Sequence, residues 1–95
     1  MPSRNEVVYG SGFFKDADGL PKEAKRKLAD LIEIIADNAF DHRLHTKPLG
    51  PPLKDKYSFR ITRDWRVGFK FLSQGRIQLL VADHRDKIYK RMERL

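Results

Sequence analysis

Hydrophobic and polar residues alternate along this chain in two different ways, and each way predicts a different kind of element. Over residues 21–40 apolar residues recur at the spacing i, i+3, i+4, i+7, which predicts an amphipathic helix with Pro21 in its first turn. Stretches with period-two alternation or many β-formers predict strands over residues 6–14, 57–61, 65–72 and 76–82. The short, strongly charged segment 85–94 is expected to form a terminal helix.

This order of elements predicts a single α+β domain over residues 1–95, large enough for one hydrophobic core. The expected fold is an N-terminal strand, an amphipathic helical region, a three-stranded antiparallel meander and a short C-terminal helix. Residues 41–56 connect the helix to the meander, and three prolines within five residues exclude a helix there. The connector carries candidates for a phosphate-binding track: His42, Arg43, His45, Lys47, Lys54 and Lys56.

The apolar positions of the meander determine its register, because residues directly opposite each other in an antiparallel pair point to the same face. Placing every apolar set on one face pairs Phe59 with Val67 across a three-residue connection, residues 62–64. The same reasoning pairs Phe71 with Ile77 around residues 73–75, where Gly75 suits the left-handed position of a bulged hairpin.

This register sets Arg60 directly opposite Arg66 on the face away from the core, with Arg66 opposite Ala82 and His84 next along that face. Like charges that face each other cost from a few tenths to about 1 kcal/mol, a conflict that a bound anion would relieve. We therefore interpret the arginine pair as a phosphate site. The alternative is a solvated face, on which the arginines diverge or pair with Asp83 or Asp86.

The charge of the chain is distributed unevenly and supports an acidic partner. Residues 1–53 hold eight Lys/Arg and eight Asp/Glu, whereas residues 54–95 hold twelve against five, which accounts for the whole net charge of +7. The sequence pI is about 9.9. RNA, DNA, an anionic membrane surface and an acidic protein all fit such a charge, and a basic half built of strands favours nucleic acid.

Other compositional features exclude several classes of protein. Without cysteine, the chain has no disulfide, no thiolate chemistry and no cysteine zinc site. We find neither a signal-peptide pattern nor an apolar stretch of the ~20 residues that a membrane span needs, so a soluble, cytoplasmic protein is expected. The histidines lack zinc-helix spacing and no Gly-rich phosphate loop is present, so neither a metal nor a cofactor is expected.

RNA cleavage is a reaction that these residue types can perform without a metal. The 2′-hydroxyl attacks the adjacent phosphate if that hydroxyl loses its proton, the charge of the phosphorane is stabilised and the leaving oxygen gains a proton. Arg60 and Arg66 are suited to hold the phosphate through bidentate, permanently charged contacts. His84 and Tyr89 are the candidates for proton transfer.

Four runs carry a resemblance to a known family: Arg43-Leu44-His45-Thr46-Lys47-Pro48-Leu49, Tyr57-Ser58-Phe59-Arg60-Ile61, Asp64-Trp65-Arg66-Val67-Gly68-Phe69 and His84-Arg85-Asp86-Lys87-Ile88-Tyr89. Together they resemble the RelE/ParE superfamily of toxins of type II toxin–antitoxin systems, over nearly the whole chain. The resemblance implies a microbial-ribonuclease-like fold and, in the RelE/YafQ branch, a metal-independent endoribonuclease that cuts mRNA on the ribosome.

The resemblance also implies roles for individual residues. It assigns catalysis to Arg60, Arg66, His84, Arg85 and Tyr89. The pair Asp64-Trp65 is similar to YafQ-like members. With the basic residues of the connector, these positions complete our candidates for RNA binding: Lys47, Lys54, Lys56, Arg63, Asp64 and Trp65. The chain departs from the family at Ser58, where RelE has a catalytic lysine, and at Lys47, near which YafQ-like members have a histidine, so the general base stays open.

Two other functions are compatible with the same residues. One is a ParE-like toxin that acts on DNA gyrase without cleaving RNA, and the other is a basic RNA-binding module without activity. The family implies three partners, namely mRNA, the ribosome and a cognate antitoxin, which we expect to be acidic and to cover the basic face or displace the C-terminal segment. No membrane partner and no small-molecule cofactor are expected.

Overall fold

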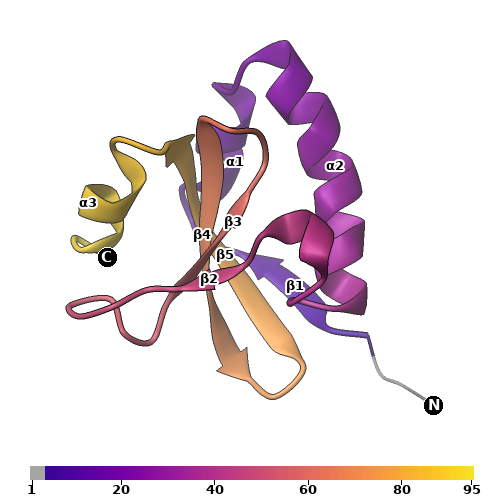
Figure 1. Ribbon diagram of the computed structural model, residues 1–95, viewed down its shortest axis with the longest axis vertical. Helices are drawn as coiled ribbons and strands as arrows, with labels where there is room; N and C mark the ends of the chain where they lie inside the picture. Colours follow the sequence, from indigo (N-terminus) through magenta and orange to yellow (C-terminus); the bar gives the residue numbers. More distant parts are fainter. Residues whose placement is uncertain (1–3) are drawn as a thin grey trace.

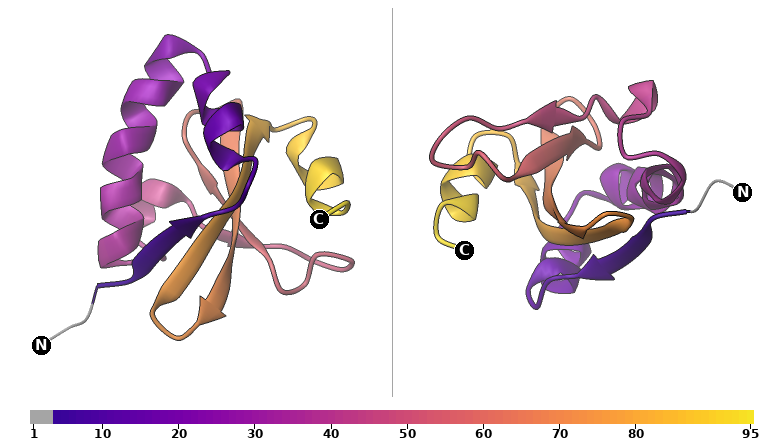
Figure 2. Two further views of the ribbon diagram at one scale, coloured as in Figure 1. Left: turned by 180° about the vertical axis from the view of Figure 1, so that it is seen from behind. Right: turned by 90° about the horizontal axis from the view of Figure 1, so that it is seen from below.

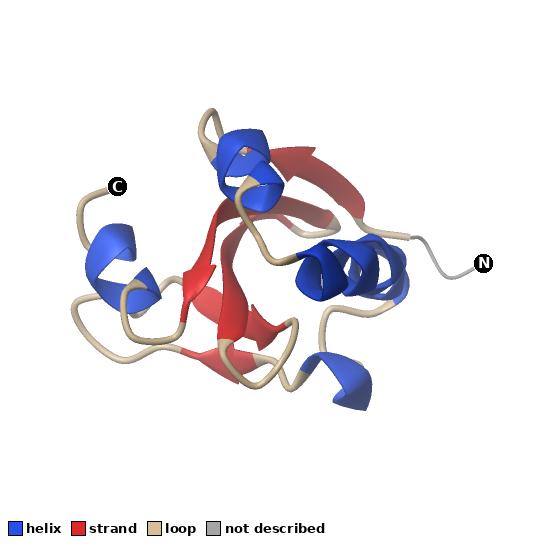
Figure 3. Cartoon of the chain, turned by 90° about the horizontal axis from the view of Figure 1, so that it is seen from above, coloured by secondary structure: helices blue, strands red, loops and turns tan. Residues whose placement is uncertain are grey.

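The computed structural model describes residues 4–95 as one five-stranded sheet with helices on both faces (Figures 1 and 3). The strand order is β1-β5-β4-β3-β2, with β1 parallel to β5 and the other neighbours antiparallel. The strands are β1 Glu6–Tyr9, β2 Lys47–Pro48, β3 Tyr57–Arg60, β4 Trp65–Ser73 and β5 Arg76–His84. The helices are α1 Phe13–Asp18, α2 Lys22–Asp37, the 3-10 helix η1 His42–Leu44 and α3 Ile88–Met92.

The long helix α2 packs on one face of the sheet and forms the main core. Its buried side carries Ala24, Leu28, Leu31 and Ile35, the residues that the helical spacing selects. Pro21 precedes the first helical residue, so the predicted helix is confirmed with a boundary shift of one residue at its start. No helix within residues 4–95 is long and apolar enough to cross a membrane.

The short helix α3 lies on the opposite face of the sheet from α2 (Figure 2). Its fully buried residues Ile88 and Met92 join Leu53 and Val81 in a second, smaller apolar cluster. Gly68 of β4 lies directly beneath Met92, and a Cβ atom at this glycine would collide with the Met92 Sδ atom. The missing side chain therefore lets α3 approach the sheet closely.

The N-terminal prediction is partly wrong, since the first strand ends at Tyr9 and residues 13–18 form helix α1. Phe13 is buried in the main core, so this aromatic residue serves a helix rather than a strand. The connector also contains more regular structure than expected. Its residues form η1 and the two-residue strand β2, which pairs Lys47 with Ser58 at the edge of the sheet.

The register of the meander is confirmed between β3 and β4 and in part between β4 and β5. Phe59 faces Val67, Arg60 faces Arg66 and Phe71 faces Ile77, as predicted. The connection between β4 and β5 is shorter than expected, because Ser73 pairs with Arg76 and leaves only residues 74 and 75 in the turn. Gly75 has the predicted left-handed conformation, with φ 82°.

A β-bulge at Leu80 corrects the predicted partner of Arg66. Gly68 pairs with Val81 and Phe69 with Leu79, so Leu80 has no partner and every later residue of β5 is shifted by one. Arg66 is therefore opposite Asp83 and not Ala82. A shift of one residue also reverses the face, and His84 lies opposite Trp65 rather than along the face of the arginines.

Candidate nucleic-acid interface

Two neighbouring guanidinium groups form the centre of the candidate site. Arg60 and Arg66 are directly opposite each other on β3 and β4, both half-buried. The Nε atoms of both side chains are buried without a hydrogen-bond partner, and neither guanidinium pairs with a carboxylate of residues 4–95. Leaving such buried donors unsatisfied costs about 1–3 kcal/mol each. Both residues also line an open hollow, in which an anion can accept from the accessible parts of the two guanidinium groups.

The register places further functional groups on the same face of the sheet. Lys47 is opposite Ser58, and Ser58 is in turn opposite Gly68, so these positions form a row next to the arginine pair. Ser58 is the buried polar side chain of this row. Because α3 crosses above the row, Tyr89 reaches down to it, with 3.5 Å between the Tyr89 Oη and Ser58 Oγ atoms.

The Tyr89 hydroxyl connects α3 to the arginine pair. Arg66 Nη1 donates to Tyr89 Oη at 3.4 Å, so the proton of the phenol is free for Ser58 or a ligand. Partial burial raises the pKa of Tyr89, but the hydrogen bond with Ser58 and the positive charges of Arg66 and Lys47 outweigh it. The net pKa is below the ordinary value, which makes the phenol a better proton donor.

A basic hollow of about 460 Å³ opens beside the arginines, at the edge of β3 that β2 leaves uncovered. Its lining combines the end of the β3–β4 hairpin with side chains from α2 and η1. We call it the basic hollow, lined by Lys27, Arg43, His45, Arg60, Ile61, Thr62, Arg63, Arg66 and Arg85. Six of these nine residues are Lys or Arg, so the hollow is a concentrated site for phosphate groups.

Two ion pairs orient arginines at the rim of the basic hollow. Asp41 accepts from Nε and Nη2 of Arg43, each at 2.9 Å, which lowers the pKa of Asp41 and raises that of Arg43. The Arg85 backbone N donates to Asp64 O at 2.7 Å, and its Nε lies 3.6 Å from the Asp64 carboxylate. The structure therefore brings Arg63, Asp64 and Arg85 together with the arginine pair.

His84 lies apart from Tyr89, on the opposite face of the sheet. Its ring packs edge-on against Trp65, with 5.3 Å between the ring centroids. Nδ1 accepts from the Asp86 backbone N at 3.2 Å and lies 3.4 Å from the Asp86 carboxylate. The structure thus does not bring His84 into contact with the arginine pair, because the bulge at Leu80 turns it away.

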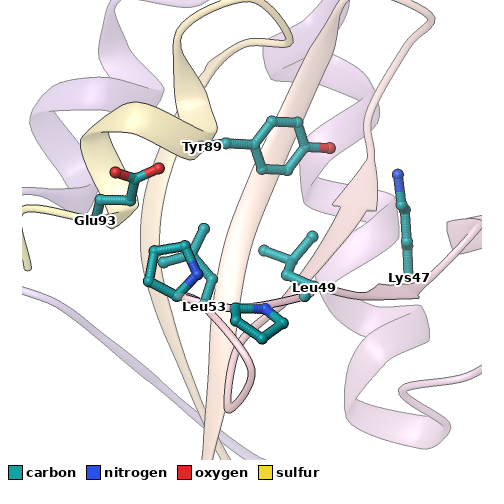
Figure 4. A pocket seen from close by; sticks show the side chains of 8 residues that line it. Lys47, Leu49, Leu53, Tyr89 and Glu93 are labelled. Atoms are coloured by element: carbon teal, nitrogen blue, oxygen red, sulfur yellow. The ribbon is translucent and has the colours of Figure 1, made fainter.

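The three predicted RNA-binding lysines do not line the basic hollow. Lys47 lines a smaller hollow of about 260 Å³ together with apolar residues of the following loop, with Tyr89 of α3 and with Glu93 directly after this helix (Figure 4). Lys54 and Lys56 belong to the loop that leads into β3. Lys56 is four residues before Arg60, which corresponds to about 13 Å along a strand. These two lysines therefore do not join the basic hollow.

Two residues of the site were not predicted from the sequence. Ser58 has the same parity as Arg60, so the register could have identified it as a neighbour of the site. Lys27 lies on the exposed side of α2, where nothing in the sequence separates it from other surface lysines. Within residues 4–95, no three His, Asp or Glu side chains gather in a place that could hold a metal ion.

No family model matches this chain, and no curated protein matches its sequence. Solved structures, however, share its fold. The YoeB/ParE toxin from Agrobacterium tumefaciens matches with a TM-score of 0.72 at 19% identity, over 84% of this chain and 98% of its own. YafQ from E. coli strain BL21(DE3) matches with a TM-score of 0.73 at 19% identity, over 90% of this chain and 99% of its own.

A third similar structure is a chain of the RelB–RelE antitoxin–toxin complex from Methanococcus jannaschii. It matches with a TM-score of 0.71 at 21% identity, over 88% of this chain and 96% of its own. The chain therefore has the α+β fold of RelE- and YafQ-type toxins over most of its length, as expected.

Proposed function

We propose that this chain is the toxin of a type II toxin–antitoxin pair and acts as an endoribonuclease that cleaves mRNA on the ribosome. The fold that it shares with YafQ and RelE supports the toxin assignment. The observation that carries the chemistry is the arginine pair, which has no carboxylate partner within residues 4–95, lines the basic hollow and lies beside a phenol of lowered pKa.

The proposed reaction is attack of a 2′-hydroxyl on the adjacent phosphate. The 2′-O–P bond forms, the P–O5′ bond breaks, and the products are a 2′,3′-cyclic phosphate and a 5′-hydroxyl. Arg60 and Arg66 would bind the non-bridging oxygens and stabilise the charge that develops on them. Arg85, at the rim of the basic hollow, would add to this stabilisation.

Tyr89 is the proposed general acid of this reaction. Its hydroxyl accepts from Arg66, so its own proton is available for the 5′-oxygen as that oxygen leaves. The 2′-hydroxyl passes its proton to a general base. His84 is not the proposed base, because it lies on the other face of the sheet.

The test is translation-coupled cleavage of a defined mRNA in a purified translation system. Wild-type protein should produce cuts with 2′,3′-cyclic phosphate ends, and Arg66→Ala should remove them. Lys70→Ala is the matched control, because it removes the same charge from the same strand outside the site. Equal cleavage by wild type and Arg66→Ala would show that the site is placed wrongly.

The same preparation distinguishes the ParE-like alternative. If wild-type protein leaves mRNA intact but traps DNA gyrase on cleaved DNA, the chain is a gyrase toxin and the nuclease proposal fails. If it binds RNA and affects neither mRNA nor gyrase, it is an RNA-binding module.

An antitoxin partner completes the proposal. Structures with this fold include antitoxin–toxin complexes of RelB–RelE and DinJ–YafQ. Since the excess charge of this chain lies in residues 54–95, we infer that its own antitoxin is acidic and covers the basic hollow.

A further inference from the structure

Tyr89 belongs to helix α3, so the position of this helix determines where the Tyr89 hydroxyl lies. Arg91 of the same helix binds two carboxylates of neighbouring elements. Arg91 Nη1 donates to Asp83 Oδ2 of β5 at 3.0 Å. Arg91 Nη2 donates to Asp16 Oδ1 of α1, also at 3.0 Å. One guanidinium therefore joins three elements that are distant in the sequence.

Asp16 is itself fixed by the backbone of the sheet. Its second oxygen, Oδ2, accepts from the Ala82 backbone N at 3.1 Å. Strand β1 pairs with β5 only as far as Leu79, so Asp16 satisfies a donor beyond the end of that pairing. The Asp16 and Asp83 side chains are 13% and 20% exposed. Both carboxylates raise the pKa of Arg91, and the hydrogen bond with Asp16 has the larger effect. Arg91 and the two carboxylates thus form a partly buried ionic bridge.

Asp83 is also the residue directly opposite Arg66. Such cross-strand neighbours have their Cβ atoms about 5 Å apart on one face of the sheet, well within reach of an arginine and an aspartate. Oδ1 of Asp83 instead accepts from the His84 backbone N at 2.7 Å, and Oδ2 accepts from Arg91. Arg66 has no carboxylate partner among the residues that the structure describes. The oxygen of Asp83 that the backbone leaves available is thus held by another arginine.

We propose that Arg91 is a positioning residue that occupies Asp83 and thereby keeps Arg66 free to bind a phosphate group. This inference rests on the proposed function in that the phosphate is the scissile one. Without Arg91, Oδ2 of Asp83 would accept from Arg66 while Oδ1 stays on the His84 backbone N, and a phosphate would have to displace it. A hydrogen bond to a charged group contributes about 1.5 kcal/mol or more, which corresponds to about tenfold weaker phosphate binding.

The test follows the Nε–Hε signal of Arg66 by NMR while inorganic phosphate is added to the full-length protein. We expect Arg91→Met to need about ten times more phosphate than wild type for half saturation. We expect Asp83→Asn/Arg91→Met to return to within about twofold of wild type, because the competing carboxylate is gone. Lys90→Met is the matched control on the same helix, and it should bind phosphate as wild type does.

Rescue by the second substitution separates this role from a purely structural one. If Arg91 only stabilised α3, removing Asp83 as well would leave binding weak, and the proposal would be overturned. Unchanged phosphate binding in Arg91→Met would overturn it too. If Arg91→Met does not fold, Arg91→Gln replaces it in the same cycle, because an amide keeps the polarity of the site but lacks the charge that holds the Asp83 carboxylate.

The outcome is independent of whether the chain cuts RNA. Weaker phosphate binding in Arg91→Met and its rescue by Asp83→Asn, without translation-coupled cleavage by wild type, would refute the nuclease proposal and support the role of Arg91. A protein that cleaves mRNA but shows no rescue would keep the nuclease and refute the role of Arg91.

Discussion

Removing the hydroxyl of Tyr89 alone separates its chemical role from its structural one. Tyr89→Phe keeps the ring that packs against the second apolar cluster around Leu53 and Ile88. Among residues 4–95 the lost oxygen has two hydrogen-bond partners, Arg66 Nη1 at 3.4 Å and Ser58 Oγ at 3.5 Å. Because contacts of this length contribute little, we expect the free energy of unfolding to change by less than about 1 kcal/mol.

The expected effect on cleavage is much larger than the effect on stability. A positioned general acid contributes about 10²- to 10⁴-fold to a rate. We therefore expect single-turnover cleavage of ribosome-bound mRNA by Tyr89→Phe to be at least about 100-fold slower than by wild type. Urea unfolding of the same two proteins provides the control for folding.

A substrate with sulfur in place of the leaving 5′-oxygen makes this test specific for the acid. A thiolate leaves without being protonated, so the thio substrate needs no general acid. We expect wild type and Tyr89→Phe to cleave it at rates within about threefold of each other, since the contribution of the acid is absent. An equally large defect on both substrates would refute the acid role and indicate that Tyr89 acts as the base or orients the RNA.

Four further predictions follow from the same geometry. Ser58→Ala removes the hydrogen bond that lowers the pKa of Tyr89, so the alkaline limb of the cleavage rate, where the phenol loses its proton, should move to higher pH; an unchanged limb would exclude Tyr89 as its source. Arg66→Lys keeps the charge but loses the bidentate fork, and cleavage should fall about tenfold or more in the single-turnover assay. Met92→Ala should lower the free energy of unfolding, measured in urea, by about 2–5 kcal/mol, since this side chain is completely buried; a cost under about 1 kcal/mol would mean that α3 is weakly anchored. Association with the acidic antitoxin should slow markedly between low and high salt, and a salt-independent rate would contradict an electrostatic interface.

Much of the fold could be predicted because its apolar positions have clear periods. The spacing of Leu28, Leu31 and Ile35 fits a helix and not a strand. In the strands, Phe59 and Val67 belong to apolar sets at every second position, which fixes the face that each strand buries. The arginine pair followed from that parity, so the centre of the site was accessible from the sequence. The sequence does not show which face of the sheet the segments before and after the arginine pair approach.

Helix α1 shows why the N-terminal segment was misread. Its residues Phe13 and Phe14 have high strand propensity, and propensity is a weak guide when one residue of a short segment enters the core. Asp16 of α1 carries no sequence signal of its role. Its actual partners, Ala82 and Arg91, are 66 and 75 residues away in the sequence, a distance that local pattern cannot span.

The bulge at Leu80 could not be predicted, because the segment Leu79-Leu80-Val81-Ala82 is apolar throughout. A continuous apolar run has no period-two signal, and either parity would bury two of its four residues on each face. The structure uses both faces. Leu79 and Ala82 lie in the main core, whereas Val81 lies in the second cluster beneath α3.

This bulge lets one strand serve two layers of the molecule. Before the bulge, Ile77 and Leu79 of β5 contribute to the main core against α2. After the bulge, the shifted register sets Asp83 opposite Arg66 and places His84 on the face opposite to the arginine pair. Without the bulge, His84 would share the face of the arginine pair, and no carboxylate would lie opposite Arg66. One extra residue in β5 thus keeps His84 off the face where Tyr89 contacts Arg66, and it brings Asp83 to the position from which, as we propose, Arg91 holds its carboxylate away from Arg66.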